Sequence, residues 1–425
     1  MKSPLTVLVV GTGGREHALV LALAAEEGAV VHAAPGNPGM AAVATLHEVD
    51  PLDGEAVASL AVSLGVDLVV VGPEAPLVAG VADVVRARGV AVFGPSRAAA
   101  QLEGSKAFSK EVMAAAGVPT AGSRTCTTPE EAAAALDEFG APYVVKDDAL
   151  AAGKGVLVTR DRDAALAHAA ACERVVIEEF LDGPEMSLFA VCDGTTAYAL
   201  QPAQDFKRIF DGGRGPNTGG MGSYTPLTWT QDDLAEVVLE TVVRPTLAEM
   251  GRRGAPFVGC LYVGLALTAK GPRVIEFNCR FGDPDIQPVL AVLDSSLGEL
   301  LAAAAEGRLA EVAAPRFRAE AAVTVVLASA GYPESSSKGD VITGVEDAAA
   351  RPGVDVIHAG TAISPTGELV TAGGRVLAVR ATGRDVADAR ATAYAAADLI
   401  SFDGMQRRSD IAAEPLGVVE GASLR

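Results

Sequence analysis

Residues 274–284 read Val-Ile-Glu-Phe-Asn-Cys-Arg-Phe-Gly-Asp-Pro. The apolar residues at 274, 275 and 277 predict a strand, and side chains two apart on a strand share a face, so Glu276 and Asn278 point the same way. A carboxylate and an amide oxygen at this spacing suit Mg²⁺, which completes its shell with waters and substrate phosphates. Arg280 continues on this face and would place a positive charge beside the metal. For Glu-x-Asn alone a solvated strand end is the competing interpretation, so the rest of the chain must decide.

The composition is that of a globular protein. The chain has 425 residues, of which 49% are hydrophobic and 21% charged; this length exceeds one core and predicts about three domains. No apolar run reaches the ~18 residues that a membrane span needs. Residues 1–11 pass directly into a predicted strand and not into a cleavable signal segment. We therefore expect a cytoplasmic protein that has no membrane partner.

The net charge and the cysteine pattern argue against further kinds of partner and site. A formal net charge of -20 argues against nucleic acid or an anionic membrane as a partner, because both need a basic surface. Any phosphate-bearing substrate must then be held by locally placed Lys, Arg and backbone N–H groups. Five cysteines are scattered without a CxxC pair, so neither a disulfide framework nor a zinc site is indicated.

The first hundred residues alternate short apolar runs with alanine-rich helical stretches. The runs at 6–10, 29–33, 67–71 and 90–93 are typical of strands buried on both faces of a parallel sheet. Each run ends in a turn rich in glycine or proline, and ligands of such sheets collect at the carboxyl ends of the strands. The sequence therefore predicts an N-terminal α/β domain whose binding edge lies at these turns.

The pattern changes after residue 101. We expect a helix carrying Lys106 and Lys110, and then a hairpin of two strands with a mobile Gly/Ala loop between them. A helix and two further strands follow, and the last third contains β-rich segments and an alanine-rich helix. The predicted segments are strands at 142–146 and 155–159, a helix near 231–250, strands at 258–268 and 273–278, β-rich stretches at 323–329, 340–345, 354–358 and 368–380, and a helix at 386–400. Three domains are predicted, at 1–104, 105–315 and 316–425, with a mobile subdomain at about 120–190.

A glycine-rich turn at 11–14 follows a strand and opens a helix, which is the context of a dinucleotide-binding fingerprint. The fingerprint fails, because Glu16 stands at the third glycine position and no acidic residue ends the second strand. A turn that offers backbone N–H groups and a helix N-terminus to an anion remains. The competing interpretation is a structural turn without ligand. His17 is expected to be a helix-surface or packing residue and not a catalyst.

The segment 148–155, Asp-Ala-Leu-Ala-Ala-Gly-Lys-Gly, has only a superficial likeness to a P-loop, since it lacks the first glycine and the final Ser or Thr. A hairpin loop of this kind can still fold over phosphates through its N–H groups. Lys146 and Lys106 could reach phosphate oxygens, although either alone would more often be a solvated surface residue.

Two further segments suit a nucleotide site. Residues 176–185, Val-Ile-Glu-Glu-Phe-Leu-Asp-Gly-Pro-Glu, could offer an extended backbone to an adenine edge and the Glu185 carboxylate to ribose hydroxyls. Residues 216–222, Pro-Asn-Thr-Gly-Gly-Met-Gly, form a loop with donors and few bulky side chains. Taken singly, the first is an acidic strand end and the second a flexible linker.

Together and in this order, the motifs resemble the phosphoribosylamine–glycine ligase (glycinamide ribonucleotide synthetase) family of ATP-grasp enzymes over nearly the whole chain. The matching blocks are GxGGREHA at 11–18, APGNPG at 34–39, VGPEAPL at 71–77, QLEGSKAFSK at 101–110, LAAGKGV at 150–156, VIEEFLDGPE at 176–185, GPNTGGMG at 215–222 and VIEFNCRFGDP at 274–284. The implied fold class is α/β and α+β multidomain, with an N-terminal parallel-sheet (pre-ATP-grasp) domain, an ATP-grasp core and a small C-terminal α/β domain.

The resemblance also implies a reaction. MgATP, glycine and 5-phosphoribosylamine would give glycinamide ribonucleotide, ADP and phosphate through glycyl phosphate, in the synthesis of purines (IMP). The implied cofactors are ATP and Mg²⁺ or Mn²⁺, bound by a protein expected to be a monomer with at most transient contacts to neighbouring purine-pathway enzymes.

The resemblance assigns roles residue by residue. Arg280 and Lys146 are the implied catalytic residues, and Glu276 and Asn278 the metal ligands. The implied ATP-binding residues are Lys106, Lys146, Gly153, Lys154, Glu178, Leu181 and Glu185. The candidates for holding glycine and the sugar phosphate are Gly13, Gly14, Arg15, Asn37, Glu74, Asp205, Lys207 and Asp283.

Some positions depart from the family pattern. Ala149 stands where glycine is usual, Asp285-Ile286 replaces Glu-Thr, and Phe210 and Arg214 lie in a variable stretch. We expect altered rates and unaltered chemistry. Two alternatives compete: a biotin-carboxylase-type or purine-carboxylating ATP-grasp enzyme with another acceptor, which would lack PNTGGMG and GGREHA, and a catalytically silent nucleotide-binding regulator, which would have lost Glu276, Asn278 or Lys146.

Overall fold

The apolar runs near the N-terminus form a five-stranded parallel sheet in the spatial order β3-β2-β1-β4-β5. The computed structural model describes residues 5–149 and 155–413. Residues 7–10 and 68–71 are fully buried, as expected of strands covered on both faces. The strands are β1 (Thr6–Gly11), β2 (Val30–Pro35), β3 (Thr45–Leu46), β4 (Leu68–Val71) and β5 (Ala91–Phe93). The helices are α1 (Gly14–Ala24), α2 (Gly54–Leu64), α3 (Glu74–Ala79) and α4 (Val81–Ala87), with a 3₁₀ turn, η1 (Met40–Ala42).

The strand order places β1 beside β4, and the chain leaves these two strands toward opposite edges of the sheet. Ligands of open parallel sheets bind at such a switch point, outside the carboxyl ends of the strands. The turn after β1 and the turn after β4 meet there, since the Gly72 N–H donates to the Val10 carbonyl at 3.0 Å. The structure thus brings together two of the predicted turns.

The predicted hairpin belongs to a four-stranded antiparallel sheet in the order β6-β9-β7-β8, called the small sheet below. Helix α7 begins with a capping box between Thr128 and Glu131 and with Pro129 at its first turn. The small sheet and its helices have a hydrophobic core of their own, centred on Leu136, Val145 and Ile177. The elements are β6 (Ser123–Cys126), α7 (Pro129–Phe139), β7 (Tyr143–Asp147), β8 (Val156–Thr159), α8 (Arg162–Ala170) and β9 (Val175–Glu178).

A second antiparallel sheet, the large sheet, has the order β11-β10-β16-β17 and ends on the strand that carries Glu276 and Asn278. Ser105 caps α6 by accepting from the Phe108 N–H, and Gly117 ends it in the left-handed conformation. The elements are α5 (Gln101–Gly104), α6 (Lys106–Ala116), β10 (Glu185–Asp193), β11 (Ala197–Ala199), α9 (Leu234–Val238), the π-helical turn η2 (Leu239–Val243), α10 (Arg244–Arg252), β16 (Val258–Thr268) and β17 (Gly271–Asn278).

The C-terminal sheet contains strands from two distant parts of the chain, in the order β12-β15-β18-β22-β19. Its strands are β12 (Gln204–Asp205), β15 (Gly222–Thr225), β18 (Ala321–Ala328), β19 (Val354–His358) and β22 (Arg375–Gly383). Around it lie the hairpin of β13 (Arg208–Phe210) and β14 (Arg214–Asn217), the hairpin of β20 (Thr361–Ile363) and β21 (Leu369–Thr371), helices α11 (Ile286–Val292), α12 (Leu297–Ala305), α13 (Val345–Ala349) and α14 (Val386–Ala397), and a 3₁₀ turn, η3 (Leu309–Glu311). Residues 204–225 precede the predicted boundary at 316, yet two of their strands lie in this sheet. The domain boundaries stay a prediction.

One predicted β-rich stretch is wrong. Residues 340–345 form no strand, and only Val341 and Thr343 make isolated bridges, to Val370 and Ser401. The apolar residues there are spaced for a strand, and main-chain hydrogen bonds join Asp340 and Ile342 to β21, but the pairing amounts to one bridge before the chain moves on to Ser401. The predicted fold class is otherwise confirmed: a parallel-sheet unit, a core of antiparallel sheets, and a C-terminal unit with helices.

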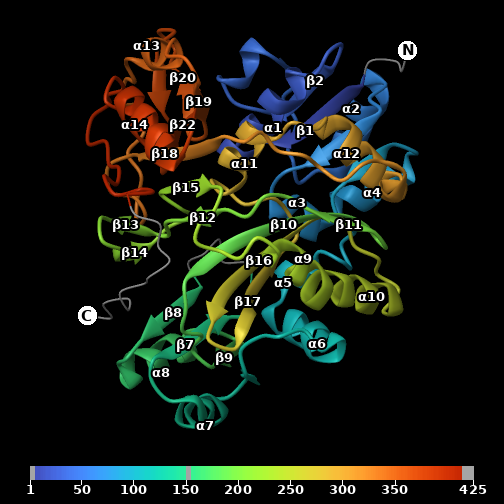
Figure 1. The fold of residues 1–425 in the computed structure, drawn as a ribbon, viewed down its shortest axis with the longest axis vertical. Helices are drawn as coiled ribbons and strands as arrows, with labels where there is room; N and C mark the ends of the chain where they lie inside the picture. The colour runs from blue at the N-terminus through green and yellow to red at the C-terminus, as the bar shows by residue number, and fades with distance from the viewer. Residues whose placement is uncertain (1–4, 150–154, 414–425) are drawn as a thin grey trace.

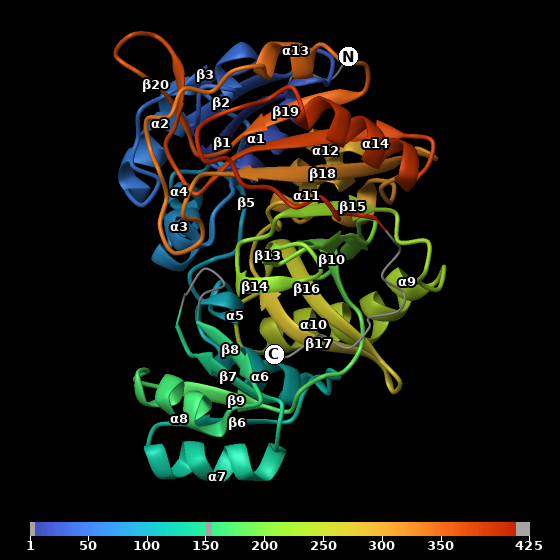
Figure 2. The ribbon, with the colours of Figure 1, turned by 90° about the vertical axis from the view of Figure 1, so that its left-hand side faces the viewer.

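Figures 1 and 2 show how the units are arranged: the N-terminal and C-terminal sheets lie at one end of the molecule, the large sheet in the middle, and the small sheet at the other end. One continuous hydrophobic core joins the first three, whereas the small sheet is packed separately. In the described ranges, no helix is long and apolar enough to cross a membrane.

Candidate active site

A cavity of about 1340 Å³ lies where the units meet. The small sheet supplies Lys146 and Val158, the large sheet supplies Glu276 and Asn278, and the C-terminal sheet supplies Arg375. The N-terminal unit contributes Arg15, Pro73 and Glu74 from the two turns at its switch point. The cleft therefore draws on every unit of the fold, which explains why its residues are scattered along the sequence.

Two lysines share one buried carboxylate at the small-sheet end of the cleft. Glu178 is 3% exposed; its Oε2 lies 2.9 Å from Lys146 Nζ and its Oε1 lies 3.1 Å from Lys110 Nζ. Lys146 also donates to the carbonyl of Ile275 at 2.9 Å, which ties the small sheet to the large one. Burial lowers the pKa of Lys110, and Glu178 opposes that shift. Glu178 thus holds both lysines at this end of the cleft.

Lys106 is the first residue of α6 and faces the hairpin between β7 and β8. Its Nζ donates to the carbonyl of Ala149 at 2.9 Å, at the edge of the predicted phosphate-covering loop. Burial lowers the pKa of Lys106, and the negative charge of Glu276 opposes this. The predicted residues Gly153 and Lys154 of that loop lie outside the described residues.

Glu185 and Lys207 form an ion pair on the cleft wall, with 2.8 Å between Oε2 and Nζ. Lys207 lowers the pKa of Glu185, against the effect of burial. Burial disfavours the charged form of Lys207, but Glu185 and Asp205 outweigh it and raise the pKa of Lys207. Leu181 lines the same part of the cleft. The structure therefore gathers these predicted ATP and substrate residues in one place.

Glu276 and Asn278 both face the cavity from β17, as their spacing predicted. The Asn278 amide is satisfied when its nitrogen donates to Glu103 Oε1 at 3.0 Å and to the Phe277 carbonyl at 3.2 Å. Its oxygen is then directed away from these acceptors. Two oxygen ligands on one strand face, beside a cavity large enough for nucleotide phosphates, fit a hard cation such as Mg²⁺.

Arg280 lies between two carboxylates. Its Nη2 is 3.0 Å from Glu103 Oε1, and its Nε is 3.3 Å from Glu74 Oε2. Burial alone would lower the pKa of Arg280, but Glu103 and Glu74 outweigh it and raise that pKa. Conversely, burial raises the pKa of Glu103, and Arg280 opposes this. A guanidinium held by two carboxylates keeps a fixed position at the cleft.

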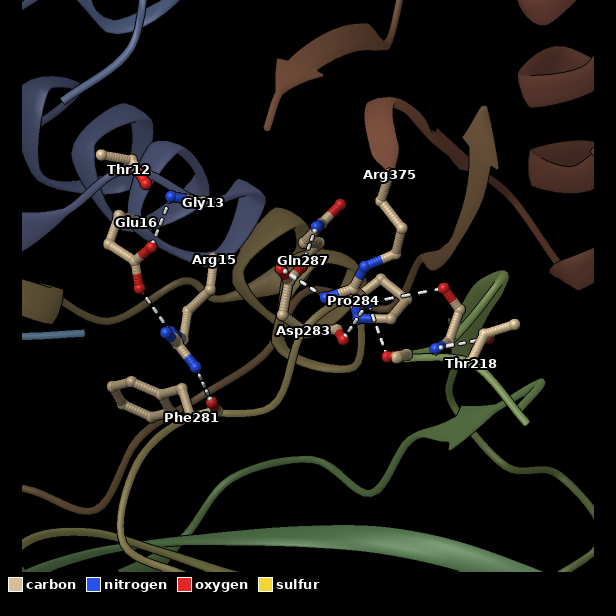
Figure 3. Close-up of polar contacts among 12 residues, drawn as sticks. Thr12, Gly13, Arg15, Glu16, Thr218, Phe281, Asp283, Pro284, Gln287 and Arg375 are labelled. Carbon is tan, nitrogen blue, oxygen red and sulfur yellow. Dashed lines mark hydrogen bonds and ion pairs between the residues drawn. The ribbon is translucent and has the colours of Figure 1, made fainter. Parts of the chain in front are cut away.

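The far end of the cleft is closed by a contact between Asp283 and Arg375. Figure 3 shows the Arg375 side chain descending from the C-terminal sheet onto the 283–284 turn and the loop after Thr218. Its Nη2 lies 3.1 Å from Asp283 Oδ2, and its Nη1 donates to the carbonyls of Asp283 and Gly219. Gln287 Nε2 donates to the other oxygen of Asp283 at 2.7 Å. Asp283 is thus fixed from two sides.

The glycine-rich turn after β1 already contains an anion. The Glu16 carboxylate accepts from the Gly13 N–H at 2.6 Å and from Arg15 Nε at 2.5 Å, as Figure 3 shows. A Cβ at Gly72 would lie 2.0 Å from Glu16 Oε1, so the glycine makes room for this side chain. Gly13 and Gly14 do not line the cavity, whereas Arg15 does. An external anion at this turn would have to displace Glu16.

Asn37 also has internal partners. Its Nδ2 donates to the carbonyls of Thr12 and His358 at 2.8 and 2.9 Å, and its Oδ1 accepts from the Gly39 N–H at 3.0 Å. His17 Nδ1 accepts from the His358 N–H at 2.8 Å, and burial lowers the pKa of His17 to about 3. Of the two places expected for His17, the helix surface and the packed interior, the structure shows the second, since His17 is 2% exposed. Asn37 joins the N-terminal turn to the C-terminal sheet.

Buried polar groups surround Asp205 behind the ion pair of Glu185 and Lys207. Burial raises the pKa of Asp205 to about 7, although Lys207 opposes this. Ser187 Oγ donates to Asp285 Oδ1 at 2.6 Å and lies 2.9 Å from the Tyr262 hydroxyl. Burial also raises the pKa of Asp285. This wall of the cleft is acidic, so it suits a small cationic group.

Charged residues that line the cleft without having been predicted as site residues include Lys110, Glu103 and Arg375. Lys110 could have been found, because it lies one helical turn after Lys106 and therefore on the same helix face. Glu103 lies in the same sequence block but acts through a tertiary contact. No sequence signal marks Arg375, which reaches the cleft only because β22 pairs with β18.

Comparisons with known proteins place the whole chain in one family. Family models for phosphoribosylglycinamide synthetase match it in three consecutive parts: the N domain at residues 5–103, the ATP-grasp (A) domain at 104–286 and the C domain at 322–414. A phosphoribosylamine–glycine ligase of Streptomyces coelicolor is 60% identical over 414 residues, 97% of this chain and 99% of that protein. One from Leifsonia xyli is 56% identical over 413 residues, 96% of this chain and 99% of that protein.

Solved structures also match this chain. The crystal structure of phosphoribosylamine–glycine ligase from Thermotoga maritima matches with a TM-score of 0.83 at 33% identity, covering 96% of this chain and 100% of that one. The biotin carboxylase domain of a Hydrogenobacter thermophilus 2-oxoglutarate carboxylase matches with a TM-score of 0.71 at 19% identity, over 96% of this chain and 92% of that one, and so shares the fold. The chain therefore belongs to the phosphoribosylglycinamide synthetase family, which is the family that its sequence motifs predicted.

Proposed function

We propose that this chain ligates glycine to 5-phosphoribosylamine with ATP, giving glycinamide ribonucleotide, ADP and phosphate, as a step of purine (IMP) biosynthesis. The observation that carries the proposal is the cleft, in which buried Lys146 on the small sheet and the pair Glu276 and Asn278 on the large sheet face one cavity. Relatives named phosphoribosylamine–glycine ligase match the chain over at least 95% of its length.

The chemistry requires activation of the glycine carboxylate, because oxide is a hopeless leaving group. A carboxylate oxygen attacks the γ-phosphorus of ATP, the bond from that phosphorus to the β-bridging oxygen breaks, and ADP leaves with glycyl phosphate formed. The amine of phosphoribosylamine then attacks the glycyl carbonyl carbon, phosphate leaves, and the amine loses a proton. The protein contributes mainly positioning and charge neutralisation.

The nucleotide half of the cleft lies between the small and large sheets. Lys106 and Lys146 neutralise the phosphates, and Glu178 keeps Lys146 in place. The main chain around Leu181 meets the adenine edge, and Glu185 meets the ribose. Glu276 and Asn278 would hold Mg²⁺ or Mn²⁺, which when bound neutralises charge on the transferred phosphoryl group.

The acceptor half lies toward the N-terminal and C-terminal sheets. Arg280, fixed between Glu74 and Glu103, faces the cleft and stabilises the acyl phosphate. The acidic wall around Asp205 suits the ammonium group of glycine, with Lys207 beside it for the carboxylate. Arg15 and Asp283 are the proposed contacts of the sugar phosphate, and Gly13, Gly14 and Asn37 support them from behind.

The same proposal includes the organisation of the protein. We place its units at 1–104, 105–315 and 316–425, with the small sheet, which has its own core, moving as a body over the nucleotide. We propose a cytoplasmic monomer that makes only transient contacts with neighbouring enzymes of the pathway.

The test is isotopic. With glycine carrying ¹⁸O in its carboxylate, ADP and singly labelled phosphate should form in every turnover, and only when glycine and phosphoribosylamine are both present. Appearance of AMP and pyrophosphate, or of unlabelled phosphate, would refute the acyl phosphate. ADP release that depends on bicarbonate would favour a carboxylating enzyme, and nucleotide binding without turnover would favour a silent regulator.

A further inference from the structure

Glu103 contacts three consecutive residues at the end of β17, by hydrogen bonds from Asn278 and Cys279 and by an ion pair with Arg280. Its Oε1 lies 3.0 Å from the Asn278 amide nitrogen and 3.0 Å from Arg280 Nη2, and its Oε2 accepts from the Cys279 N–H at 2.8 Å. The Glu103 side chain is only 8% exposed. A single carboxylate therefore organises the backbone and both functional side chains at this point.

The contact with Asn278 has a chemical consequence. An asparagine amide can turn either its oxygen or its nitrogen toward the cleft, and only the oxygen can bind a cation. The Glu103 carboxylate has no proton to donate when ionised, so it accepts from the amide nitrogen and repels the amide oxygen. The amide oxygen is thereby left for the cavity.

Glu103 comes from α5, outside the large sheet, in the segment that leads from the N-terminal unit into α6. Helix α5 packs against β17, and the end of that strand is joined to the chain leaving the N-terminal unit at this carboxylate. Glu74 is a natural comparison. It also faces Arg280, at 3.3 Å, and it lies near Arg15, at 4.0 Å, but within the described part of the chain it makes no hydrogen bond with Asn278.

We propose that Glu103 is a positioning residue that presents the Asn278 amide oxygen to the divalent cation and holds Arg280 beside it. The inference rests on the proposed function, and in particular on Glu276 and Asn278 as metal ligands. Partners of metal ligands contribute ~10- to 100-fold to metal affinity in other metal sites, and a contribution of that size is expected of Glu103.

The experiment compares Glu103→Gln with Glu74→Gln in the full chain. A glutamine at 103 keeps the shape but has one acceptor oxygen in place of two, so its NH₂ group faces either the Asn278 and Arg280 donors or the Cys279 N–H, and the contact that orients the Asn278 amide is lost or weakened. The measurement is Mn²⁺ binding to the protein in the presence of saturating ADP, followed by electron paramagnetic resonance. It needs neither glycine nor phosphoribosylamine, so it stays informative even if the proposed ligation reaction is wrong.

We expect Glu103→Gln to weaken Mn²⁺ binding by at least tenfold and Glu74→Gln to change it by less than twofold. Equal weakening in both variants would mean that only the charge around Arg280 matters, and unchanged binding in Glu103→Gln would mean that the carboxylate merely anchors α5; either result overturns the proposal. Should Glu103→Gln fold poorly in thermal melts, Glu103→Asp provides the second arm, because its shorter carboxylate withdraws from the Asn278 amide and still keeps a negative charge near Arg280; unchanged Mn²⁺ binding in a folded Glu103→Asp would overturn the proposal. A separate test uses Asn278→Asp. This variant keeps a metal-binding oxygen whatever its rotation, so combined with Glu103→Gln it should recover most of the lost Mn²⁺ affinity, and no recovery would contradict the proposal.

Discussion

Arg375 Nη2 lies 3.1 Å from Asp283 Oδ2, although 92 residues separate the two in sequence. The same guanidinium donates to main-chain carbonyls on both sides of the contact, so the start of β22 is fastened to the acceptor end of the cleft. The C-terminal sheet therefore takes part in the site and does not merely cover it.

Replacing the Arg375 guanidinium should affect the KM for phosphoribosylamine and not the KM for ATP. Arg375→Lys leaves a single ammonium that cannot bridge Asp283 and Gly219 together. We expect the KM for phosphoribosylamine to rise about tenfold, equivalent to about 1.4 kcal/mol, while the KM for ATP changes less than twofold. Steady-state kinetics measure both. Arg390→Lys is the control, because Arg390 also donates to main-chain carbonyls, of Ile411 and Ser409, on a helix away from the cleft. A rise in both constants would contradict the prediction.

Glu178→Gln should damage both the fold and the nucleotide site. Lys110 and Lys146 are 9% and 5% exposed at their side chains, and the variant leaves their charges buried together without a carboxylate. Such a loss costs about 3 kcal/mol of unfolding free energy, measurable by urea denaturation, and the KM for ATP should rise. Glu55→Gln serves as the control, since Glu55 pairs with Arg88 at the surface and is 68% exposed; about 0.5 kcal/mol or less is expected there.

The unfolding free energy of the protein should depend on pH through Asp205. Burial raises its pKa from 3.8 to about 7, so the protonated form is favoured in the folded state. The stabilisation is present at low pH and is lost as the pH rises through about 7. The unfolding free energy of Asp205→Asn, relative to that of the wild type, should therefore rise by on the order of 2 kcal/mol between pH 5 and pH 8. This is less than the full pKa shift would give, because water in the cleft weakens the effect of burial. A difference that does not vary with pH would show that Asp205 does not titrate in this range.

The metal assignment predicts loss of activity without loss of fold. Glu276→Gln removes the negative charge of one metal ligand, and Asn278→Ala removes the amide oxygen of the other, at a strand end that faces the cavity and not the core. Ligation should fall by at least about 100-fold in each variant, while the melting temperature stays within about 3 °C of wild type. Near-normal turnover at saturating Mg²⁺ in both variants would rule out these ligands.

Some of the site followed from local patterns alone. The alternation of side chains along a strand was enough to place Glu276 and Asn278 on one face, and the buried apolar runs were enough to place the turns after β1 and β4 at one edge. These predictions depend only on the period of a strand and on the geometry of parallel sheets.

Other features depend on tertiary contacts that no local pattern encodes. The Gly13 N–H was expected to meet an external anion, but Glu16 supplies the carboxylate three residues later. Residues 340–345 have the apolar spacing of a strand, but they meet β21 and Ser401 at isolated bridges and form no continuous ladder. Glu103 and Arg375 matter because of what lies opposite them in space, and a single sequence carries no record of that.

The pairing of β15 with β18 has a consequence for synthesis of the chain. During translation β15 emerges about a hundred residues before β18, with which it pairs from Gly222 to Thr225. The edge of β15 that faces β18 therefore stays unpaired while the intervening segment is synthesised. Such long-range pairing slows folding and exposes a strand edge to other chains. A fragment beginning after residue 315 would leave the β18 edge open and should aggregate, unless a peptide spanning β12 to β15 is supplied to complete the sheet.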